Sequence, residues 1–185
     1  MSALVISAFP GCGKSTYYKN WSLYSPENKY RQVGKEGIGE RILDSDSSNF
    51  KWFHDENGVK SDVQVPWFPN NYIEHIKTHM ETEDIIFVSS HKEVRDALKE
   101  NGIPYILIYP DRSLKSMWME RFRVRGNTEE FIKFQNENWD NFIDQMEQDD
   151  YPTHVILRHN KESIPYITLT LMKGLQKMMK PSPLV

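Results

Sequence analysis

Residues 8–16 read Ala-Phe-Pro-Gly-Cys-Gly-Lys-Ser-Thr, and they constrain the fold of this chain more than any other segment. They follow residues 4–8, a short apolar run typical of a buried strand, and they precede a segment with helical character. The pattern matches the phosphate-binding loop G-x-x-x-x-G-K-[S/T], with Ala8 in place of the first glycine. Because such a loop joins a buried strand to a helix, it predicts an α/β chain that binds a nucleoside triphosphate, expected to be ATP with Mg²⁺.

The residue types of this loop suit phosphate chemistry. Gly11 and Gly13 let backbone N–H groups turn inward toward phosphate oxygens, and the following helix adds the positive end of its dipole. We expect Lys14 to neutralise the β- and γ-phosphates. Ser15 is the predicted Mg²⁺ ligand, and Thr16 is expected to reach the α-phosphate.

Cys12 lies inside the loop and is the one cysteine of the chain. Its backbone N–H is expected to face the phosphates, whereas its thiol is not expected to be catalytic. The helix N-terminus would lower the pKa of this thiol and make it oxidisable. A single cysteine excludes an internal disulfide. His75 and His79 are spaced as in zinc sites, but no third ligand accompanies them, so no zinc is predicted and they are interpreted as a polar helix face.

The composition is that of a globular chain. The 185 residues suit one domain over residues 1–185, with 38% hydrophobic and 26% charged residues. The net charge of −3 provides no global basic field of the kind that duplex-DNA binders show. The N-terminus has no basic region followed by a long apolar stretch, and no apolar run approaches the length of about 18 residues that spans a membrane. These features predict a cytoplasmic protein without a membrane partner.

Apolar runs alternate with amphipathic segments along the chain. Strands are predicted at residues 4–8, 41–44, 84–89, 103–109 and 153–158. Helices are predicted at residues 14–21, 69–80, 92–100, 113–125, 127–148 and 164–179, the fifth capped by Asn127 and Glu130. Residues 24–39 are interpreted as a loop, 50–68 as irregular and 181–183 as a loose tail. The alternation predicts a three-layer fold, an about five-stranded parallel sheet with helices on both faces, whose ligands bind at the carboxyl ends of the strands.

An acidic pair follows the second predicted strand, in the sequence Asp44-Ser45-Asp46. Phosphoryl transfer to a hydroxyl needs a group that accepts or orients its proton, and it needs oxygens near Mg²⁺. Asp46 is the first candidate for the general base and Asp44 the second. Asp44 is also a candidate metal ligand together with Ser15. The alternative is a solvated strand exit in which one carboxylate caps a turn.

Two arginines follow the fourth predicted strand at helical spacing. Arg121 and Arg125 are four residues apart and share one helix face, where planar guanidinium groups suit phosphate oxygens. Gly126 then allows a break in the chain. We interpret residues 112–130 as a helical lid that closes over the donor and stabilises transition-state charge. The alternative is a solvated charged face, which is the interpretation of Arg123.

Other signals are weaker. The third predicted strand ends at Ser89-Ser90 without the acidic residue that many phosphate-loop proteins carry there. Arg158, at the end of the last predicted strand, is a candidate for stacking on the adenine. Arg95 is interpreted either as a contact for acceptor phosphate or as surface charge. The aromatic residues between 50 and 72 are interpreted mainly as core, with at least one of them able to stack on a base.

The phosphate loop, the Asp-Ser-Asp sequence and the Arg-x-x-x-Arg-Gly sequence together resemble small P-loop kinases, chiefly phage-type nucleotide kinases and the kinase domain of polynucleotide kinase. The resemblance covers residues 3–17, 41–47 and 84–127. It implies that an aspartate beyond the second strand acts as base for a 5′-hydroxyl and that a lid arginine contacts phosphate. Asp44-Ser45-Asp46 is also similar to the sequence that holds the acceptor hydroxyl in shikimate kinase. Residues 49–68 are unmatched, and residues 47–75 are interpreted as an acceptor-side insertion.

The sequence therefore predicts an ATP- and Mg²⁺-dependent kinase that moves the γ-phosphoryl group to a nucleotide-class acceptor: a nucleoside, nucleotide or nucleic-acid hydroxyl. Three alternatives stay open. A deoxynucleoside monophosphate kinase would use a phosphate acceptor and would need further cationic groups on the acceptor side. A nucleotide-binding protein without transfer activity would fit the missing carboxylate after the third strand. A kinase for a small metabolite alcohol would use the same donor residues.

Overall fold

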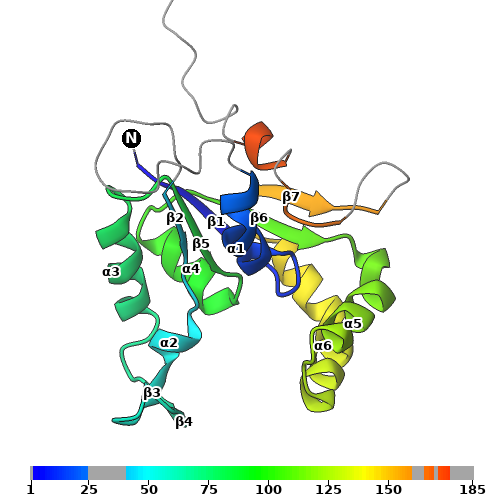
Figure 1. Cartoon of the computed structure of the whole chain (residues 1–185), viewed down its shortest axis with the longest axis horizontal. Helices are drawn as coiled ribbons and strands as arrows, with labels where there is room; N and C mark the ends of the chain where they lie inside the picture. Colours follow the sequence, from blue (N-terminus) through cyan, green and yellow to red (C-terminus); the bar gives the residue numbers. More distant parts are fainter. Residues whose placement is uncertain (1, 25–40, 160–164, 169–170, 176–185) are drawn as a thin grey trace, which may run out of the picture.

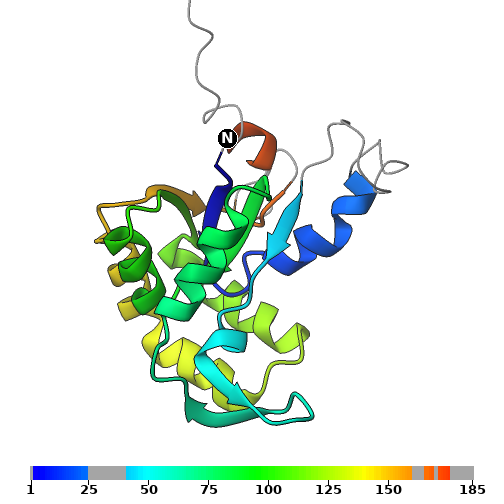
Figure 2. The same cartoon turned by 90° about the vertical axis from the view of Figure 1, so that its left-hand side faces the viewer.

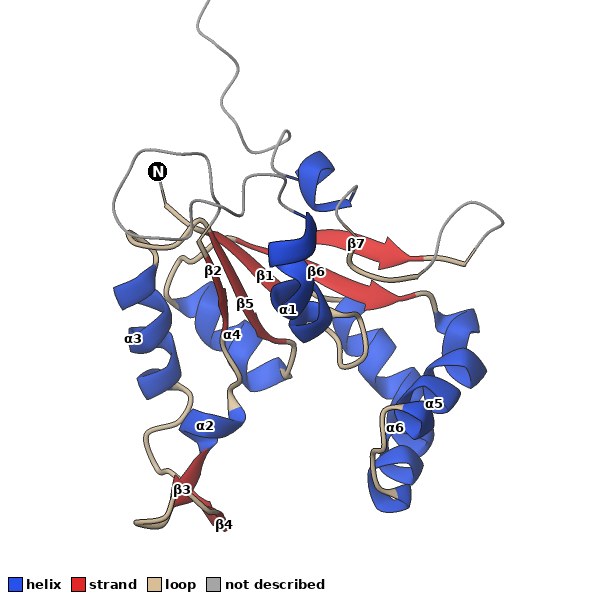
Figure 3. Cartoon of the chain, in the orientation of Figure 1, coloured by secondary structure: helices blue, strands red, loops and turns tan. Residues whose placement is uncertain are grey.

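The structure is a computed structural model that describes residues 2–24, 41–159, 165–168 and 171–175. Its elements along the chain are β1 (Leu4–Ala8), α1 (Lys14–Tyr24), β2 (Ile42–Asp44), α2 (Ser48–Lys51), β3 (Trp52–His54), β4 (Lys60–Gln64), α3 (Asn70–His79), β5 (Ile85–Ser89), α4 (Lys92–Glu100), β6 (Tyr105–Pro110), the 3-10 helix η2 (Arg112–Leu114), α5 (Lys115–Val124), α6 (Glu129–Glu147) and β7 (Thr153–Leu157). Residues 171–175 are also helical. Figures 1 and 3 show their arrangement.

The five-stranded parallel sheet has the order β2-β5-β1-β6-β7. Val5 of β1 is in register with Ile86 of β5 on one side and with Tyr105 of β6 on the other. Every residue of β1 and β6 is buried, as expected for strands covered on both faces. The predicted fold class, an α/β chain with about five parallel strands between helical layers, is confirmed.

The connections between strands place the helices on the two faces. The chain moves in one direction across the sheet from β1 through α1 to β2, and in the opposite direction through α3, α4 and α6. Because parallel crossovers are right-handed, α1 covers one face and the other three helices cover the opposite face (Figure 2). The direction reverses between β1 and β5, and ligands of such sheets bind at this reversal, beyond the carboxyl ends of the strands.

The segment predicted to be irregular, residues 50–68, is more ordered than expected. It contains the end of the single helical turn α2 and the antiparallel hairpin of β3 and β4. Asn57-Gly58 forms the turn, with Gly58 at a φ of 76° and with the Asp55 carboxylate accepting from the backbone N–H of Asn57 and Val59. An Asn-Gly pair between two short strands is the sequence signal that predicts this hairpin.

Two predicted helix boundaries were wrong. The N-cap of α6 is Thr128 rather than Asn127, and its side chain accepts from the backbone N–H of Phe131. Residues 165–168, expected to begin the last helix, are not helical. The loop predicted over residues 24–39 and the tail at 181–183 lie outside the described residues, except for residue 24, which ends α1.

The helices α5 and α6 pack against each other and against the phosphate loop through aromatic rings. Trp118 lies 6.3 Å from Trp139 between ring centroids, and Phe122 lies 5.2 Å from Phe131. Phe9, the second residue of the loop segment, meets Trp139 edge to face at 5.6 Å. This packing fixes the position of α5 beside the loop. None of the helices that the structure describes has the length and apolar character needed to cross a membrane.

Candidate active site

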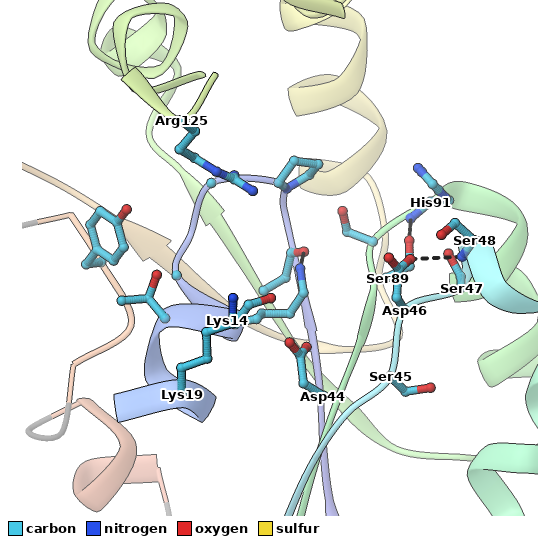
Figure 4. Close-up of a pocket in the computed structure, with 18 residues that line it drawn as sticks. Lys14, Lys19, Asp44, Ser45, Asp46, Ser47, Ser48, Ser89, His91 and Arg125 are labelled. Atoms are coloured by element: carbon cyan, nitrogen blue, oxygen red, sulfur yellow. Dashed lines mark hydrogen bonds between the residues drawn. The ribbon is translucent and has the colours of Figure 1, made fainter. Parts of the chain in front are cut away.

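A cavity of about 470 Å³ opens at the carboxyl ends of β1, β2 and β5 (Figure 4). Three segments contribute most of its wall: the phosphate loop, the residues after β2 and the residues after β5. Arg125 and Tyr166 complete the wall. The lining residues are Ala8, Pro10, Gly11, Gly13, Lys14, Ser15, Thr16, Lys19, Asp44, Ser45, Asp46, Ser47, Ser48, Ser89, Ser90, His91, Arg125 and Tyr166.

The two glycines of the loop are required by its backbone and by its neighbours. Gly11 has a φ of 83° and Gly13 a φ of 100°, values that residues with a Cβ rarely adopt. A Cβ on Gly11 would lie 2.9 Å from Nε1 of Trp118, and one on Gly13 would lie 2.3 Å from Cδ1 of Tyr166. The loop is therefore held in its turned conformation by aromatic rings pressed against it.

Lys14 lies in the wall of the cavity at the first residue of α1. Its Nζ donates to the carbonyl oxygen of Ala8 at 2.6 Å, which closes the loop on itself. Removal from water lowers the pKa of Lys14, while Cys12 and the carboxylates of Asp44 and Asp46 act in the opposite direction. Because the Lys14 ammonium is poorly hydrated, a bound anion such as a phosphate would stabilise its charged form. Ser15 and Thr16 are exposed beside it and line the same cavity.

The two aspartates face the cavity at different places. Figure 4 shows the Asp44 carboxylate on the Lys14 side and Asp46 on the side of Ser48. One oxygen of Asp46, Oδ1, accepts from the backbone N–H of Ser48 at 2.9 Å, so Asp46 both lines the cavity and holds the turn that leads into α2. The expected turn contact is thus present at Asp46, and its role as a catalytic carboxylate stays a prediction.

The backbone between the aspartates is fixed by buried hydrogen bonds. The Ser45 N–H donates to the Phe87 carbonyl at 2.9 Å, and the Tyr72 hydroxyl donates to the Ser45 carbonyl at 2.8 Å. Tyr72 is fully buried, and burial raises the pKa of its hydroxyl, which therefore stays a donor. These bonds orient both neighbouring carboxylates without using them.

Arg121 does not join the cavity. Its Nη1 donates to the carbonyl oxygens of Gly11 at 3.0 Å and Pro165 at 3.1 Å. Its guanidinium lies between two rings, 3.9 Å from the centroid of Trp118 and 4.2 Å from that of Tyr166. Arg121, predicted to contact the transition state, instead ties the phosphate loop to residues 165–168.

Arg125, one helical turn further along the chain, is exposed and lines the cavity. Figure 4 shows its guanidinium extending over the phosphate loop. Arg123 forms an ion pair with Glu120 at 2.5 Å on the outer surface, in line with its interpretation as a solvent-facing residue. Of the predicted arginine pair, Arg125 is the member placed to meet a bound phosphate.

Cys12 is fully buried, and its backbone is already bonded. Its N–H donates to the Phe9 carbonyl at 3.1 Å, and its carbonyl accepts from the Ile167 N–H at 2.8 Å. Burial raises the pKa of the thiol to about 12. The prediction of a phosphate-facing N–H is therefore wrong, because this N–H is bonded to Phe9. The predicted lowering of the thiol pKa is also wrong, because desolvation outweighs the charges of Lys14 and Arg121.

Arg158 and Arg95 also lie outside this cavity. Arg158 is exposed after β7, where its Nε lies 3.5 Å from the Asp111 carboxylate. Arg95 is 2% exposed, forms an ion pair with Asp149 and donates to the Ser90 carbonyl at 3.1 Å. The adenine contact expected of Arg158 stays a prediction, and the guanidinium of Arg95 is already engaged.

Sequence reasoning missed Trp118 and Tyr166, whose rings lie against the glycines of the loop. Trp118 donates from Nε1 to the Pro10 carbonyl at 2.8 Å, and Tyr166 covers Gly13. Trp118 precedes Arg121 by three residues on one helix face, a spacing that would have suggested a joint role. The position of Tyr166 had no local signal.

Comparison with models of known protein families and with curated proteins found no match for this chain.

Proposed function

We propose that this protein is a kinase that transfers the γ-phosphoryl group of ATP to a hydroxyl of a nucleotide-class acceptor. The observation that carries the proposal is the convergence of a glycine-turned loop, Lys14, Arg125 and two aspartates on one cavity. A donor half with cationic groups and an acceptor half with a carboxylate are what phosphoryl transfer to a hydroxyl requires. The proposal agrees with the resemblance of the motifs to small P-loop kinases.

The donor half binds and polarises the triphosphate. The Lys14 ammonium and the N-terminus of α1 supply positive charge, and Arg125 supplies a planar guanidinium above the loop. Mg²⁺ usually keeps several waters and takes one or two carboxylates beside phosphate oxygens, so the Ser15 hydroxyl and the Asp44 carboxylate are a donor set that fits it. The metal would neutralise charge that develops on the phosphates.

The acceptor half orients the nucleophile. The acceptor oxygen forms a bond to the γ-phosphorus, the bond from that phosphorus to the β,γ-bridging oxygen breaks, and ADP leaves. The hydroxyl proton passes to Asp46, whose carboxylate is held in place by the Ser48 N–H through Oδ1. Arg125 compensates the charge on the transferring group.

A hydroxyl acceptor is better supported than a monophosphate acceptor. A second phosphate would need cations that are not already compensated, and Arg95 was the candidate. Arg95 is buried and paired with Asp149. The carboxylate of Asp46, by contrast, suits an acceptor whose hydroxyl proton has to be accepted or oriented, whereas a monophosphate is already anionic and needs no base.

The test is transfer of label from γ-labelled ATP to a panel of acceptors: nucleosides, nucleoside 5′-monophosphates, 5′-hydroxyl oligonucleotides and small polyols. We expect labelled product only with acceptors that offer a hydroxyl on a nucleoside or oligonucleotide. Asp46→Asn keeps an oxygen that can accept from the Ser48 N–H but removes the base, and it should lower kcat by about 10²–10⁴-fold. Glu100→Gln, an exposed charge at the far end of α4, is the matched control.

Three outcomes would contradict the proposal. Exclusive labelling of monophosphates on their phosphate group, which gives nucleoside diphosphates, would favour the phosphate-acceptor alternative, and exclusive labelling of small polyols would favour a metabolite kinase. Tight ATP binding without transfer to any member of the panel would favour a nucleotide-binding protein. Unchanged kcat in Asp46→Asn would remove the assignment of the base while leaving the kinase assignment in place.

A further inference from the structure

A second cavity, of about 570 Å³, lies beside the first one between α4, α6 and the start of the phosphate loop. Pro10, Ser90 and His91 line both cavities. Figure 4 shows His91 on the side of the first cavity where Asp46 lies, so the second cavity adjoins the first there. Its volume is within the range of roughly 300–1,000 Å³ that small-ligand sites occupy.

One part of the wall of this second cavity is formed by apolar side chains, beside polar and charged residues. Phe9, Phe134 and Phe142 contribute rings, and Met146 adds a flexible thioether. Phe134 and Phe142 lie 5.7 Å apart between ring centroids with an interplanar angle of 59°. Phe134 is 52% exposed, although large apolar side chains gain most by burial. A half-exposed ring at the rim of such a cavity is suited to stacking on a planar ligand.

The charged residues of this wall are already neutralised by partners. Lys51 pairs with Glu93 at 2.6 Å, and Lys92 pairs with Asp96 at 2.6 Å. Arg95 pairs with Asp149. A ligand with its own phosphate would have to compete with these carboxylates, so the part of the ligand that enters this cavity should be uncharged.

Gln135 supplies the polar recognition group. It lies on α6 in the wall of the cavity and is 6% exposed. Its Oε1 is buried and has no hydrogen-bond partner among the described residues. An unpaired buried carbonyl oxygen is costly, and a ligand N–H that reached it would remove that cost.

We propose that this second cavity binds the heteroaromatic base of the acceptor, stacked on Phe134 and hydrogen-bonded through a ring or amino N–H to Gln135. This inference rests on the proposed kinase function, because it assigns the acceptor side of that site. The base then lies on α6, the sugar lies at the boundary formed by Pro10, Ser90 and His91, and the sugar hydroxyl reaches Asp46. A hydroxyl acceptor with an aromatic base fits both cavities, whereas a polyol fits only the first.

The test measures binding and transfer separately on the full chain. Isothermal calorimetry with adenosine, guanosine, cytidine, uridine and thymidine, without ATP, reports base binding directly, and 1,4-anhydroribitol serves as the ligand without a base. We expect at least one nucleoside to bind and the anhydroribitol to bind at least about tenfold more weakly. Phe134→Ala should weaken nucleoside binding about tenfold or more, because base stacking on an aromatic ring is lost.

Gln135→Leu is expected to weaken the same nucleosides to a similar extent and to change the order of preference among bases, since it removes the one polar contact. In the transfer assay both variants should raise the acceptor KM and leave kcat and the KM for ATP within about twofold. Lys133→Ala, on the outer face of α6 and outside the cavity wall, is the matched control. Thermal unfolding of Gln135→Leu checks its fold, while the half-exposed Phe134 can be truncated without a core defect.

The readouts distinguish the two proposals. If no acceptor is phosphorylated but nucleosides bind and Phe134→Ala weakens them, the kinase assignment fails and the base site stands. If transfer occurs but no nucleoside binds the wild type more tightly than the anhydroribitol, the base site is overturned. Equal nucleoside affinities of wild type and Phe134→Ala would overturn it as well.

Discussion

The two sides of the phosphate loop differ in how their polar groups are used. The packed side is formed by Trp118, Arg121 and Tyr166, of which Tyr166 also borders the cavity. There, donors meet acceptors inside the protein and rings press on the glycines. On the open side, formed by Asp44, Asp46 and Arg125, charged side chains face the cavity. The packed side holds the shape of the loop, and the open side presents its charges to a ligand.

This difference teaches how to assign roles within one motif. Arg121 and Arg125 share a helix face and a side-chain type, yet Arg121 has two carbonyl partners and two ring contacts while Arg125 extends over the loop. A group whose hydrogen bonds are satisfied internally positions other residues. A charged group at the wall of a cavity is available for chemistry. The contrast predicts separable effects on stability and on activity.

The largest effect is expected at Lys14, which lies between the two sides because it donates to the Ala8 carbonyl and also lines the cavity. Lys14→Met should reduce phosphoryl transfer on the order of 10³-fold, because it removes the cation that the β- and γ-phosphates need. Equilibrium dialysis with Mg²⁺ and ATP and single-turnover transfer measure it, with Lys133→Met as control. A large loss of unfolding free energy with wild-type ATP affinity would show that Lys14 holds the shape of the loop, as the packed side does, and does not bind phosphate.

Next in size is Arg125→Ala, which should lower kcat about 10²–10³-fold through loss of a donor to the transferring group. Its melting temperature should stay within about 1–2 °C of wild type, because exposed side chains contribute little to stability. Arg123→Ala, which removes an exposed arginine paired with Glu120, is the matched control. A lower melting temperature of Arg125→Ala with an unchanged kcat would contradict the assignment of Arg125 to the open side.

Arg121→Ala should show the opposite pattern to Arg125→Ala, with a large effect on stability and a small effect on kcat. Loss of two ring contacts and of donors to two carbonyls should reduce the unfolding free energy by roughly 1–3 kcal/mol. We expect a raised KM for ATP, because the loop loses the tie between Gly11 and Pro165. Arg121→Lys restores the charge but not the planar stacking and should rescue little. Urea unfolding and ATP kinetics measured on the same samples decide between a positioning and a catalytic role.

The features that could be predicted from the sequence are those with local signals. The strand before the loop, the loop and the helix after it are contiguous, and the alternation of apolar runs gave the parallel sheet. The positions of Asp44 and Asp46 at the carboxyl end of β2 followed from the predicted end of that strand. The hairpin of β3 and β4 also had a local signal, the Asn57-Gly58 pair.

The features that could not be predicted depend on partners far apart in the chain. Arg121 and Gly11 are separated by 110 positions, and Arg95 and Asp149 by 54. A sequence motif shows that a cationic side chain is present. It does not show whether that side chain is already hydrogen-bonded to a carbonyl or paired with a carboxylate elsewhere in the protein. The same holds for Cys12, where burial by the surrounding core reversed the expected pKa shift.

A substitution at Gly13 tests how tightly the packed side presses on the loop. Gly13→Ala adds a Cβ 2.3 Å from the Tyr166 ring at a φ of 100°, and it should cost roughly 2–5 kcal/mol of unfolding free energy. Gly102→Ala is the control, because Gly102 also has a positive φ of 65° but nothing lies within 4 Å of its added Cβ. It should cost only about 1 kcal/mol. Equal losses of unfolding free energy in the two variants, measured by urea unfolding, would show that the Tyr166 ring moves away easily and that the packed side is loosely packed.

The smallest effect is expected at Cys12, whose thiol should not react with a thiol reagent in the native protein. Because burial raises the pKa of this thiol to about 12, it stays protonated and shielded at about pH 8, near the ordinary pKa of a free cysteine. Dithionitrobenzoate should therefore label the native protein negligibly and label one thiol per chain in urea. Rapid native labelling would show that the loop opens away from Trp118 and Tyr166 without ligand. The packed side would then form only when a nucleotide binds, and the distinction between a holding side and a presenting side would apply to the bound state alone.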